Sequence, residues 1–123
     1  MSLVSIRGAI TVEENTREAI LEATHEMLEA ILKSNELRLD ELVQLHFSCT
    51  KDLDAAYPAV AARALGITEA SLMCFQEMYV VNSLNQCIRV DVLVESPHLN
   101  RKTIKHQYLR RATKLRPDLL NKE

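Results

Sequence analysis

Three arginines stand in otherwise apolar segments, a placement that is typical of a site for an anionic ligand. Arg7 belongs to an IRGA stretch, Arg89 to a CIRV stretch and Arg116 to an LRP stretch. A guanidinium beside a hydrophobic core is costly to desolvate unless a carboxylate or a phosphate pairs with it. The only two glycines, Gly8 and Gly66, exclude both a Walker loop and a dinucleotide-binding fingerprint. A small carboxylate is therefore the favoured ligand.

Size and composition predict one domain, residues 1–123, without a membrane partner. Of the 123 residues 47% are hydrophobic and only 4% aromatic, so a shared subunit interface would help to stabilise such a small core. No apolar run approaches the roughly 20 residues that a membrane helix needs. The N-terminus also lacks the pattern of a signal peptide. We expect a cytoplasmic protein.

The cysteines and histidines indicate neither a disulfide framework nor a metal site. Cys49, Cys74 and Cys87 are odd in number and widely spaced, which fits a reducing compartment. The four histidines never pair at ligand spacing with each other or with a cysteine. We expect no metal.

The C-terminal residues 98–123 are basic, with eight Lys and Arg against two acidic residues, or +6 in a chain whose net charge is −2. Such a tail can bind nucleic acid. Here apolar residues interrupt the charges, which favours a packed segment with a solvated cationic face. We therefore expect no nucleic-acid partner.

Alternating polar and apolar residues predict strands. The expected strands are residues 3–10, 43–49, 71–78, 87–94 and 105–109. Arg7 and Arg89 both lie opposite the Val/Ile face of their strands. A helix over residues 17–33 is predicted by its apolar stripe and by Thr16 as its cap. Pro58 and Gly66 bound a short second helix, and a helical turn follows the last strand.

This order of elements predicts an α+β fold, with one mixed five-stranded sheet and helices on one face. The other face is left for a partner subunit. In this frame six ordered blocks resemble the AroH-class monofunctional chorismate mutases, over nearly the whole chain. The blocks are Ile6-Arg7-Gly8-Ala9 with Thr11-Val12-Glu13; Asp52-Leu53 with Tyr57-Pro58-Ala59 and Ala62-Arg63; Cys74-Phe75-Gln76-Glu77-Met78; Cys87-Ile88-Arg89-Val90; His106-Gln107-Tyr108-Leu109; and Leu115-Arg116-Pro117-Asp118-Leu119.

The resemblance implies a homotrimer with a barrel-like core and three active sites in clefts between subunits. It also implies a pericyclic conversion of chorismate to prephenate, on the route to phenylalanine and tyrosine, without cofactor or covalent intermediate. By this match Arg89 stabilises the negative charge that grows on the ether oxygen. Arg7 and Tyr108 bind a carboxylate, and Glu77 and Cys74 hold the ring-hydroxyl end.

The remaining matched positions surround these residues. Met73 is expected to offer backbone contacts, Arg63 and Arg116 to lie near the mouth, and Tyr57 and Leu115 to form apolar walls. Each matched residue also has a plain structural interpretation, as a surface charge, a core thiol or ordinary packing. The ordered match favours the site roles for Arg7, Glu77, Arg89 and Tyr108, and it leaves Arg63, Arg116 and Tyr57 open.

Three positions depart from the family's pattern. Tyr57 stands where Phe is familiar, Val60 where a charged residue is common, and Asn82 in place of a glycine-containing turn, although Asn tolerates the left-handed conformation. Two other classes also remain open. Small trimeric imine and enamine deaminases bind carboxylates with arginine on the same general fold, and a non-catalytic nucleic-acid module would use the basic tail.

Overall fold

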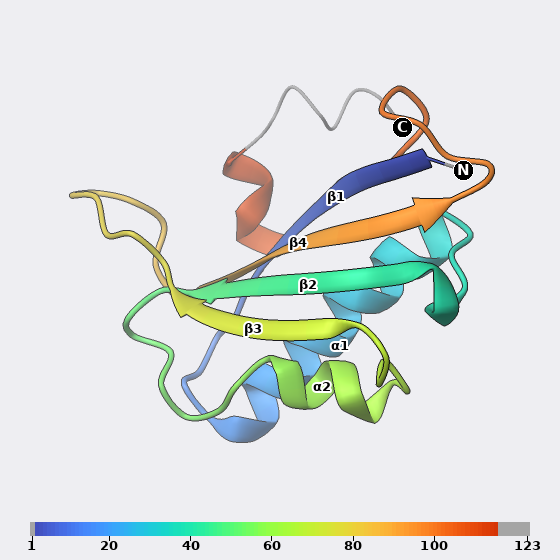
Figure 1. The fold of residues 1–123 in the computed structure, drawn as a ribbon. Coiled ribbons are helices and arrows are strands. Elements are labelled where there is room, and N and C mark those ends of the chain that lie inside the picture. Colours follow the sequence, from blue (N-terminus) through green and yellow to red (C-terminus); the bar gives the residue numbers. More distant parts are fainter. Residues whose placement is uncertain (1, 116–123) are drawn as a thin grey trace.

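The computed structural model describes residues 2–115 as a five-stranded sheet with two α-helices (Figure 1). In chain order the elements are β1 (Ser2–Thr11), α1 (Arg17–Ser34), β2 (Leu42–Cys49), α2 (Ala59–Ala64), β3 (Ser71–Gln76), β4 (Cys87–Ser96) and β5 (Gln107–Leu109), with 3-10 helices at Leu39–Glu41 and Arg110–Lys114. The strand order is β3-β2-β4-β1-β5. β4 pairs antiparallel with β1 and β2, whereas β3 and β5 pair parallel with β2 and β1. The predicted mixed sheet is confirmed.

Two predicted strands are longer than the observed ones, and the pairing explains both errors. The third strand ends at Gln76 because its partner β2 ends at Cys49; Glu77 donates one more backbone hydrogen bond to the Cys49 carbonyl before the chain turns away. The fifth strand begins at Gln107, because the backbone of Lys105 forms hydrogen bonds with the side chain of Asn35, the C-cap residue of α1, instead of with β1. Arg116 lies outside the described residues.

Helix α1 forms where the sequence predicts it. The Thr16 hydroxyl accepts a hydrogen bond from the Ala19 amide at 3.1 Å and caps the helix start. Gly8 allows the helix to lie close to β1, since a Cβ there would be only 2.7 Å from Ile31 Cδ1. Asn82 adopts the left-handed conformation (φ 67°), as the sequence suggests.

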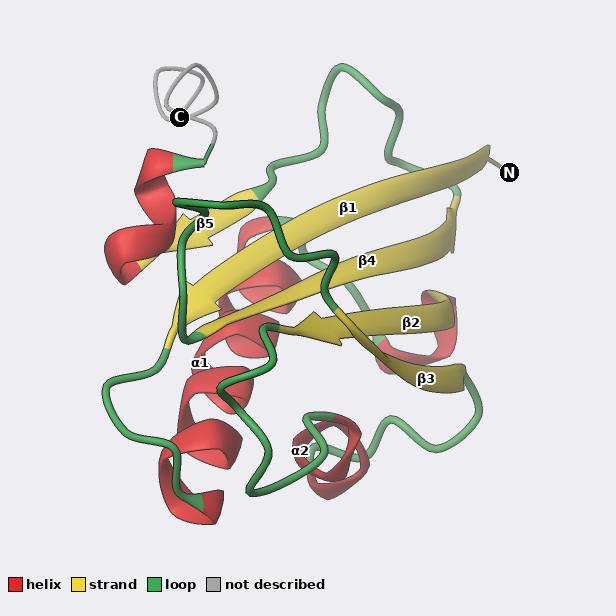
Figure 2. Ribbon diagram, turned by 90° about the vertical axis from the view of Figure 1, so that its left-hand side faces the viewer, coloured by secondary structure: helices red, strands yellow, loops and turns green. Residues whose placement is uncertain are grey.

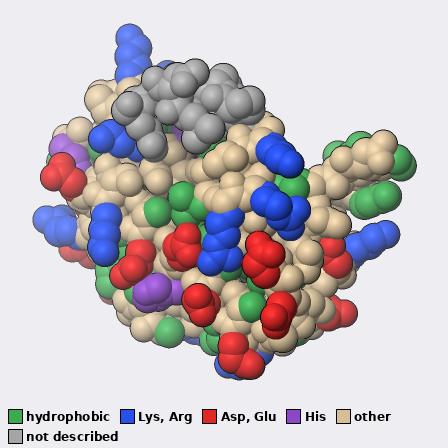
Figure 3. Space-filling model, turned by 180° about the vertical axis from the view of Figure 1, so that it is seen from behind, with side chains coloured by type: hydrophobic (Ala, Val, Ile, Leu, Met, Phe, Trp, Pro, Cys, Tyr) green, Lys and Arg blue, Asp and Glu red, His purple; other side chains and the backbone are tan. Residues whose placement is uncertain are grey.

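Both helices cover the same face of the sheet (Figures 1 and 2). The side chains between the helices and this face form the main core, which includes Ile6, Ile10, Phe47, Ile88 and Val92. The side of the molecule seen in Figure 3, opposite to the view of Figure 1, carries interspersed acidic and basic side chains. None of the described helices is long and apolar enough to cross a membrane. The opposite face, called the free face below, carries no described α-helix; only the 3-10 helix Arg110–Lys114 packs against one end of it, through Ala112.

Candidate active site

The strand register places a row of side chains across the free face. Tyr108 on β5 pairs with Ala9 on β1, which pairs with Arg89 on β4; Arg89 in turn pairs with Ser48 on β2. Since paired residues project from the same face of a sheet, the alternation that puts Val90 into the core puts Arg89 on the free face. Arg7 lies two residues before Ala9 and so shares this face.

Arg89 and Glu77 form the centre of this face. Glu77 follows the end of β3 and its Oε1 lies 3.6 Å from Arg89 Nε, which is ion-pair distance but too long for a hydrogen bond. The Arg89 side chain is 32% exposed and the Glu77 side chain 25% exposed. Ser48 Oγ donates a hydrogen bond to the same Glu77 oxygen. Arg89 Nε is buried and finds no hydrogen-bond partner among the described residues.

A cavity of about 140 Å³ opens over this pair, and Arg7 stands at its side. Its walls are Arg7, His46, Ser48, Glu77, Arg89, Val90 and Asp91. The Arg7 backbone is fixed because its amide donates to His106 Nδ1 at 2.9 Å. Asp91 pairs with Arg7 in the register, and its carboxylate accepts a hydrogen bond from Ser5 Oγ. Two guanidinium groups thus face one small cavity.

Tyr108 lies on the free face next to Ala9, at the β5 edge of the sheet. It is buried in a small cluster with Ala9, Cys87 and Ala112, against which Leu115 packs. Burial raises the pKa of the Cys87 thiol, and the nearby Arg89 guanidinium offsets part of that rise. The predicted residues Arg7, Glu77, Arg89, Tyr108 and Leu115 therefore share the free-face side of β1 and β4. We call Arg7, Glu77, Arg89 and Tyr108 the free-face cluster.

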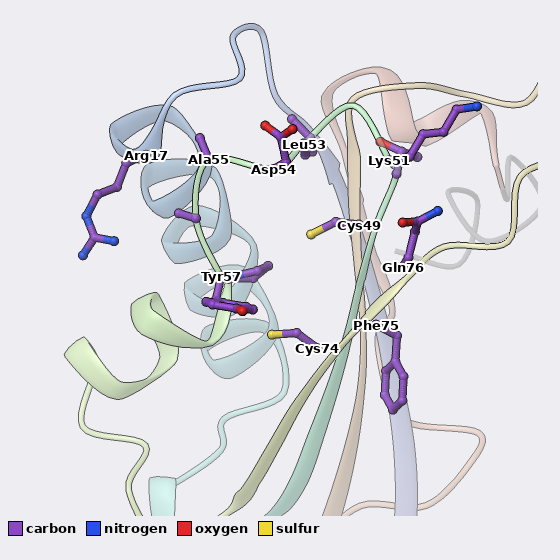
Figure 4. Close-up of a pocket in the computed structure, with 13 residues that line it drawn as sticks. Arg17, Cys49, Lys51, Leu53, Asp54, Ala55, Tyr57, Cys74, Phe75 and Gln76 are labelled. Atoms are coloured by element: carbon purple, nitrogen blue, oxygen red, sulfur yellow. The ribbon is translucent and has the colours of Figure 1, made fainter.

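A larger cavity, of about 570 Å³, lies on the helix side at the other edge of the sheet. Its lining includes Cys49, Cys74, Tyr57 and Arg17. In Figure 4 Cys74 points from β3 toward Tyr57, whereas Phe75 points to the opposite side of the strand. Tyr57 is 71% exposed. We call this the helix-side cavity.

The Cys49 thiol of this cavity is not poised for nucleophilic chemistry. Burial, together with the neighbouring Cys74 and Cys87, raises the pKa of the Cys49 thiol to about 12. A neutral thiol is a poor nucleophile and a poor metal ligand. Within residues 2–115, His, Cys, Asp and Glu form no group of three that could hold a metal ion.

The structure thus divides the predicted site residues between two surfaces. Cys74 and Tyr57 line the helix-side cavity, and Arg63 is exposed on the adjacent α2. Met73 is exposed and lies on the free face, the same face as His46, with which it pairs. Sequence reasoning missed Ser48 and His46 as neighbours of Arg89; their polar alternation was visible, but their register with β4 was not.

Comparison with known proteins identifies the family. The family model described as chorismate mutase type I matches residues 3–119. The chain is 42% identical to the chorismate mutase AroH of Bacillus subtilis, over 97% of this chain and 94% of that protein. It is 44% identical to the chorismate mutase AroH of Thermus thermophilus, over 93% of each chain.

A solved structure agrees with the sequence relatives. A chorismate mutase from Clostridium thermocellum superposes with a TM-score of 0.88 at 43% identity, covering 90% of this chain and 98% of that one. The family-model match over residues 3–119 includes all four residues of the free-face cluster. The chain belongs to the chorismate mutase type I family, and so to the isomerases.

Proposed function

We propose that this protein converts chorismate to prephenate at the free-face cluster, in the synthesis of phenylalanine and tyrosine. The observation that carries the proposal is the buried Nε of Arg89, a charged donor that has no hydrogen-bond partner in the described chain. A buried donor left unpaired is costly, and a ligand oxygen would remove that cost. Family membership does not favour the deaminase alternative.

Chorismate carries two carboxylates, an ether oxygen and a ring hydroxyl, and its rearrangement breaks the ether C–O bond while a C–C bond forms. Negative charge grows on the ether oxygen because the C–O bond breaks ahead of C–C closure. Arg89 would stabilise that oxygen more in the transition state than in the ground state. No atom is gained or lost, so no nucleophile or cofactor is required.

The neighbours of Arg89 would hold the substrate in a reactive shape. Arg7 provides a fork of donors for a carboxylate, and the Tyr108 hydroxyl lies on the same side of the sheet. Together they would fold the enolpyruvyl arm over the ring, which lowers the entropic part of the barrier. Glu77 would accept a hydrogen bond from the ring hydroxyl, with Ser48 holding its carboxylate.

We further propose that each active site is completed by a second copy of the chain. The sheet separates the free-face cluster from Cys74 and Tyr57, so one chain does not bring them to one ligand. The free face also exposes apolar side chains at Leu3 and Phe75. In a homotrimer the free-face cluster of one subunit would face the helix-side cavity of the next.

Within this assembly the outer residues would bind substrate without taking part in the bond changes. Tyr57, Cys74 and Arg63 would come from one subunit, and Leu115 and Arg116 would join the free-face cluster of the other. Each chain would contribute residues 1–123 as one mutase domain. Since Cys49, Cys74 and Cys87 are free thiols, the proposal places the enzyme in the reducing cytoplasm.

The proposal is tested by following chorismate loss in the ultraviolet with purified protein and no added metal or cofactor. Prephenate is confirmed by its acid conversion to phenylpyruvate. Arg89→Ala is expected to lower kcat by on the order of 10² to 10³, the effect of removing one preorganised donor. Arg38→Ala is the matched control, because Arg38 is an exposed arginine paired with Asp40 far from the free face.

Two results would contradict the proposal. One is a well-folded wild-type protein that leaves chorismate unchanged. The other is an Arg89→Ala protein of unchanged oligomeric state that turns chorismate over at nearly the wild-type rate, which would remove Arg89 from the chemical step.

A further inference from the structure

Strand β5, which carries Tyr108, is weakly held by the sheet itself. It has three residues at the sheet edge, and it pairs only with β1, in parallel register, through Gly8–Gln107, Ala9–Tyr108 and Ile10–Leu109 (Figure 2). So short an edge strand has little stability of its own. Other contacts must therefore fix the position of Tyr108.

Asn35, at the C-terminal end of α1, supplies contacts at the start of this segment. Its Nδ2 donates to the Lys105 carbonyl at 3.0 Å, and its Oδ1 accepts from the Lys105 amide at 2.7 Å. The side-chain amide thus pairs with Lys105 as a neighbouring strand residue would. Nδ2 also donates to the Ile31 carbonyl at 2.9 Å, which anchors the amide to the last turn of the helix.

The burial of Asn35 makes these bonds strong constraints. Only 3% of the residue is exposed, so water cannot replace the bonds when they break. Losing either partner would leave buried polar groups unpaired, which is more costly than losing the same bond at the surface. The amide is also neutral, so dissolved salt does not screen it.

A second contact holds the other end of the segment to the same helix. Arg110, which follows β5, donates to the Thr11 carbonyl at 2.9 Å and to Glu26 Oε1 at 2.8 Å. It does so in the left-handed conformation (φ 55°), which a non-glycine residue adopts only when its surroundings require it. Since Glu26 and Asn35 both belong to or adjoin α1, the helix braces residues 105–110 at both ends.

We propose that Asn35 is a positioning residue of the active site: through the backbone of Lys105 it sets the place of β5 and hence of the Tyr108 hydroxyl. This inference rests on the proposed role of Tyr108 in binding a carboxylate of chorismate. Asn35 touches no substrate and acts through the strand alone. The residue lies far outside the ordered blocks that point to the site, so its role comes from the contacts of the folded chain.

The test is a double-mutant cycle on kcat/KM for chorismate, with Asn35→Ala, Tyr108→Phe and the double variant. Tyr108→Phe is expected to lower kcat/KM about tenfold, the effect of losing one hydrogen bond to a charged group. Asn35→Ala should lower it by a similar factor in the wild type, but by less than about twofold when Tyr108 already lacks its hydroxyl.

Thr16→Ala is the matched control, because it removes the cap at the other end of the same helix and does not contact β5. It should lower the melting temperature while kcat/KM stays within about twofold of wild type. If Asn35→Ala does not fold, Asn35→Asp takes its place in the cycle, since it keeps the oxygen that accepts from the Lys105 amide and loses the donor.

The outcomes separate the inference from the function on which it rests. Unchanged kcat/KM in Tyr108→Phe would overturn the role of the hydroxyl itself. If Tyr108→Phe is impaired, the inference on Asn35 is overturned by an unimpaired Asn35 variant, by equal losses in both backgrounds, or by an equal loss in Thr16→Ala.

Discussion

The free-face cluster and the helix-side cavity differ in size, charge and constraint. The first surrounds about 140 Å³ and holds a guanidinium and a carboxylate that are each about one-quarter to one-third exposed. The second encloses about 570 Å³, and its walls include an exposed tyrosine and the Cys49 thiol, whose pKa burial raises to about 12. The smaller cavity therefore holds its charged groups half-buried beside one another, and the larger one, which Arg17 and Lys51 also line, has room for the substrate's ring.

In the proposed assembly the two regions would have different roles in one active site. Stabilising a transition state needs dipoles and charges fixed before the reaction begins, and the Ser48–Glu77–Arg89 arrangement meets that need. Binding a ring needs contact area, which Tyr57 offers only when something covers it. A cleft between two copies of the chain would unite the two.

The most direct test of this comparison mixes two damaged proteins. Arg89→Ala disables the free-face cluster, and the double variant Tyr57→Ala/Arg63→Ala damages the helix-side half, with an expected loss in kcat/KM of about tenfold. If each cleft takes one half from each of two subunits, equal amounts unfolded and refolded together should join two intact halves in about a quarter of the clefts. Activity should rise to about a quarter of the wild-type value.

The control mixes the same proteins without unfolding, so that subunits do not exchange, and should show only the average of the two parents. Mixed oligomers are verified by tagging one variant and copurifying the other. Mixed oligomers with no activity above that average would mean that each site lies within one chain, and the comparison of two half-sites would fail.

Two substitutions at Glu77 test how the free-face cluster uses its carboxylate. Glu77→Gln keeps an oxygen that accepts from Ser48 and from the ring hydroxyl, so kcat should fall only about tenfold; Glu77→Ala should lose on the order of 10². The same two changes at Glu22, an exposed carboxylate of α1 on the other side of the molecule, are the control. Equal losses from both Glu77 variants would show that its charge matters, and not its hydrogen bond.

The sequence predicted the face of the sheet on which Arg7 and Arg89 lie, because local alternation decides the face of a strand. Arg7 and Arg89 were expected opposite the Val/Ile face, and their pairing through β1 and β4 confirms it. The starts of α1 and α2 were predicted from Thr16 and Pro58, which are also local signals. The family resemblance supplied the roles, which local patterns do not contain.

What the sequence did not predict depends on contacts between distant segments. The register that sets Ser48 beside Arg89 joins residues 41 positions apart, and no local pattern specifies it. Lys105 was expected in a strand, but its backbone bonds to Asn35. The placement of Cys74 and Glu77 at one end of the site stays a prediction; within one chain Cys74 lines the helix-side cavity and Glu77 lines the cavity on the free face.

The smallest expected effect concerns Cys49, whose thiol lines the helix-side cavity. The pKa of Cys49 rises from about 9 to about 12 on folding, so between these pH values the unfolded chain has lost a proton that the folded chain keeps. The free energy of unfolding should therefore fall as pH rises from 9 to 12, by at most about 1.4 kcal/mol per pH unit. Below pH 9 the group should contribute no slope.

The measurement compares denaturant unfolding of wild type and Cys49→Ala from pH 7 to pH 11, because the difference cancels the tyrosines and lysines that titrate there. The alanine variant should lack this part of the fall, and its kcat at pH 7 should match wild type. Rapid alkylation of Cys49 by iodoacetamide in the folded protein at pH 8 would contradict the assignment, since a neutral buried thiol reacts slowly. The helix-side cavity would then hold a reactive group, and its role could not be limited to binding.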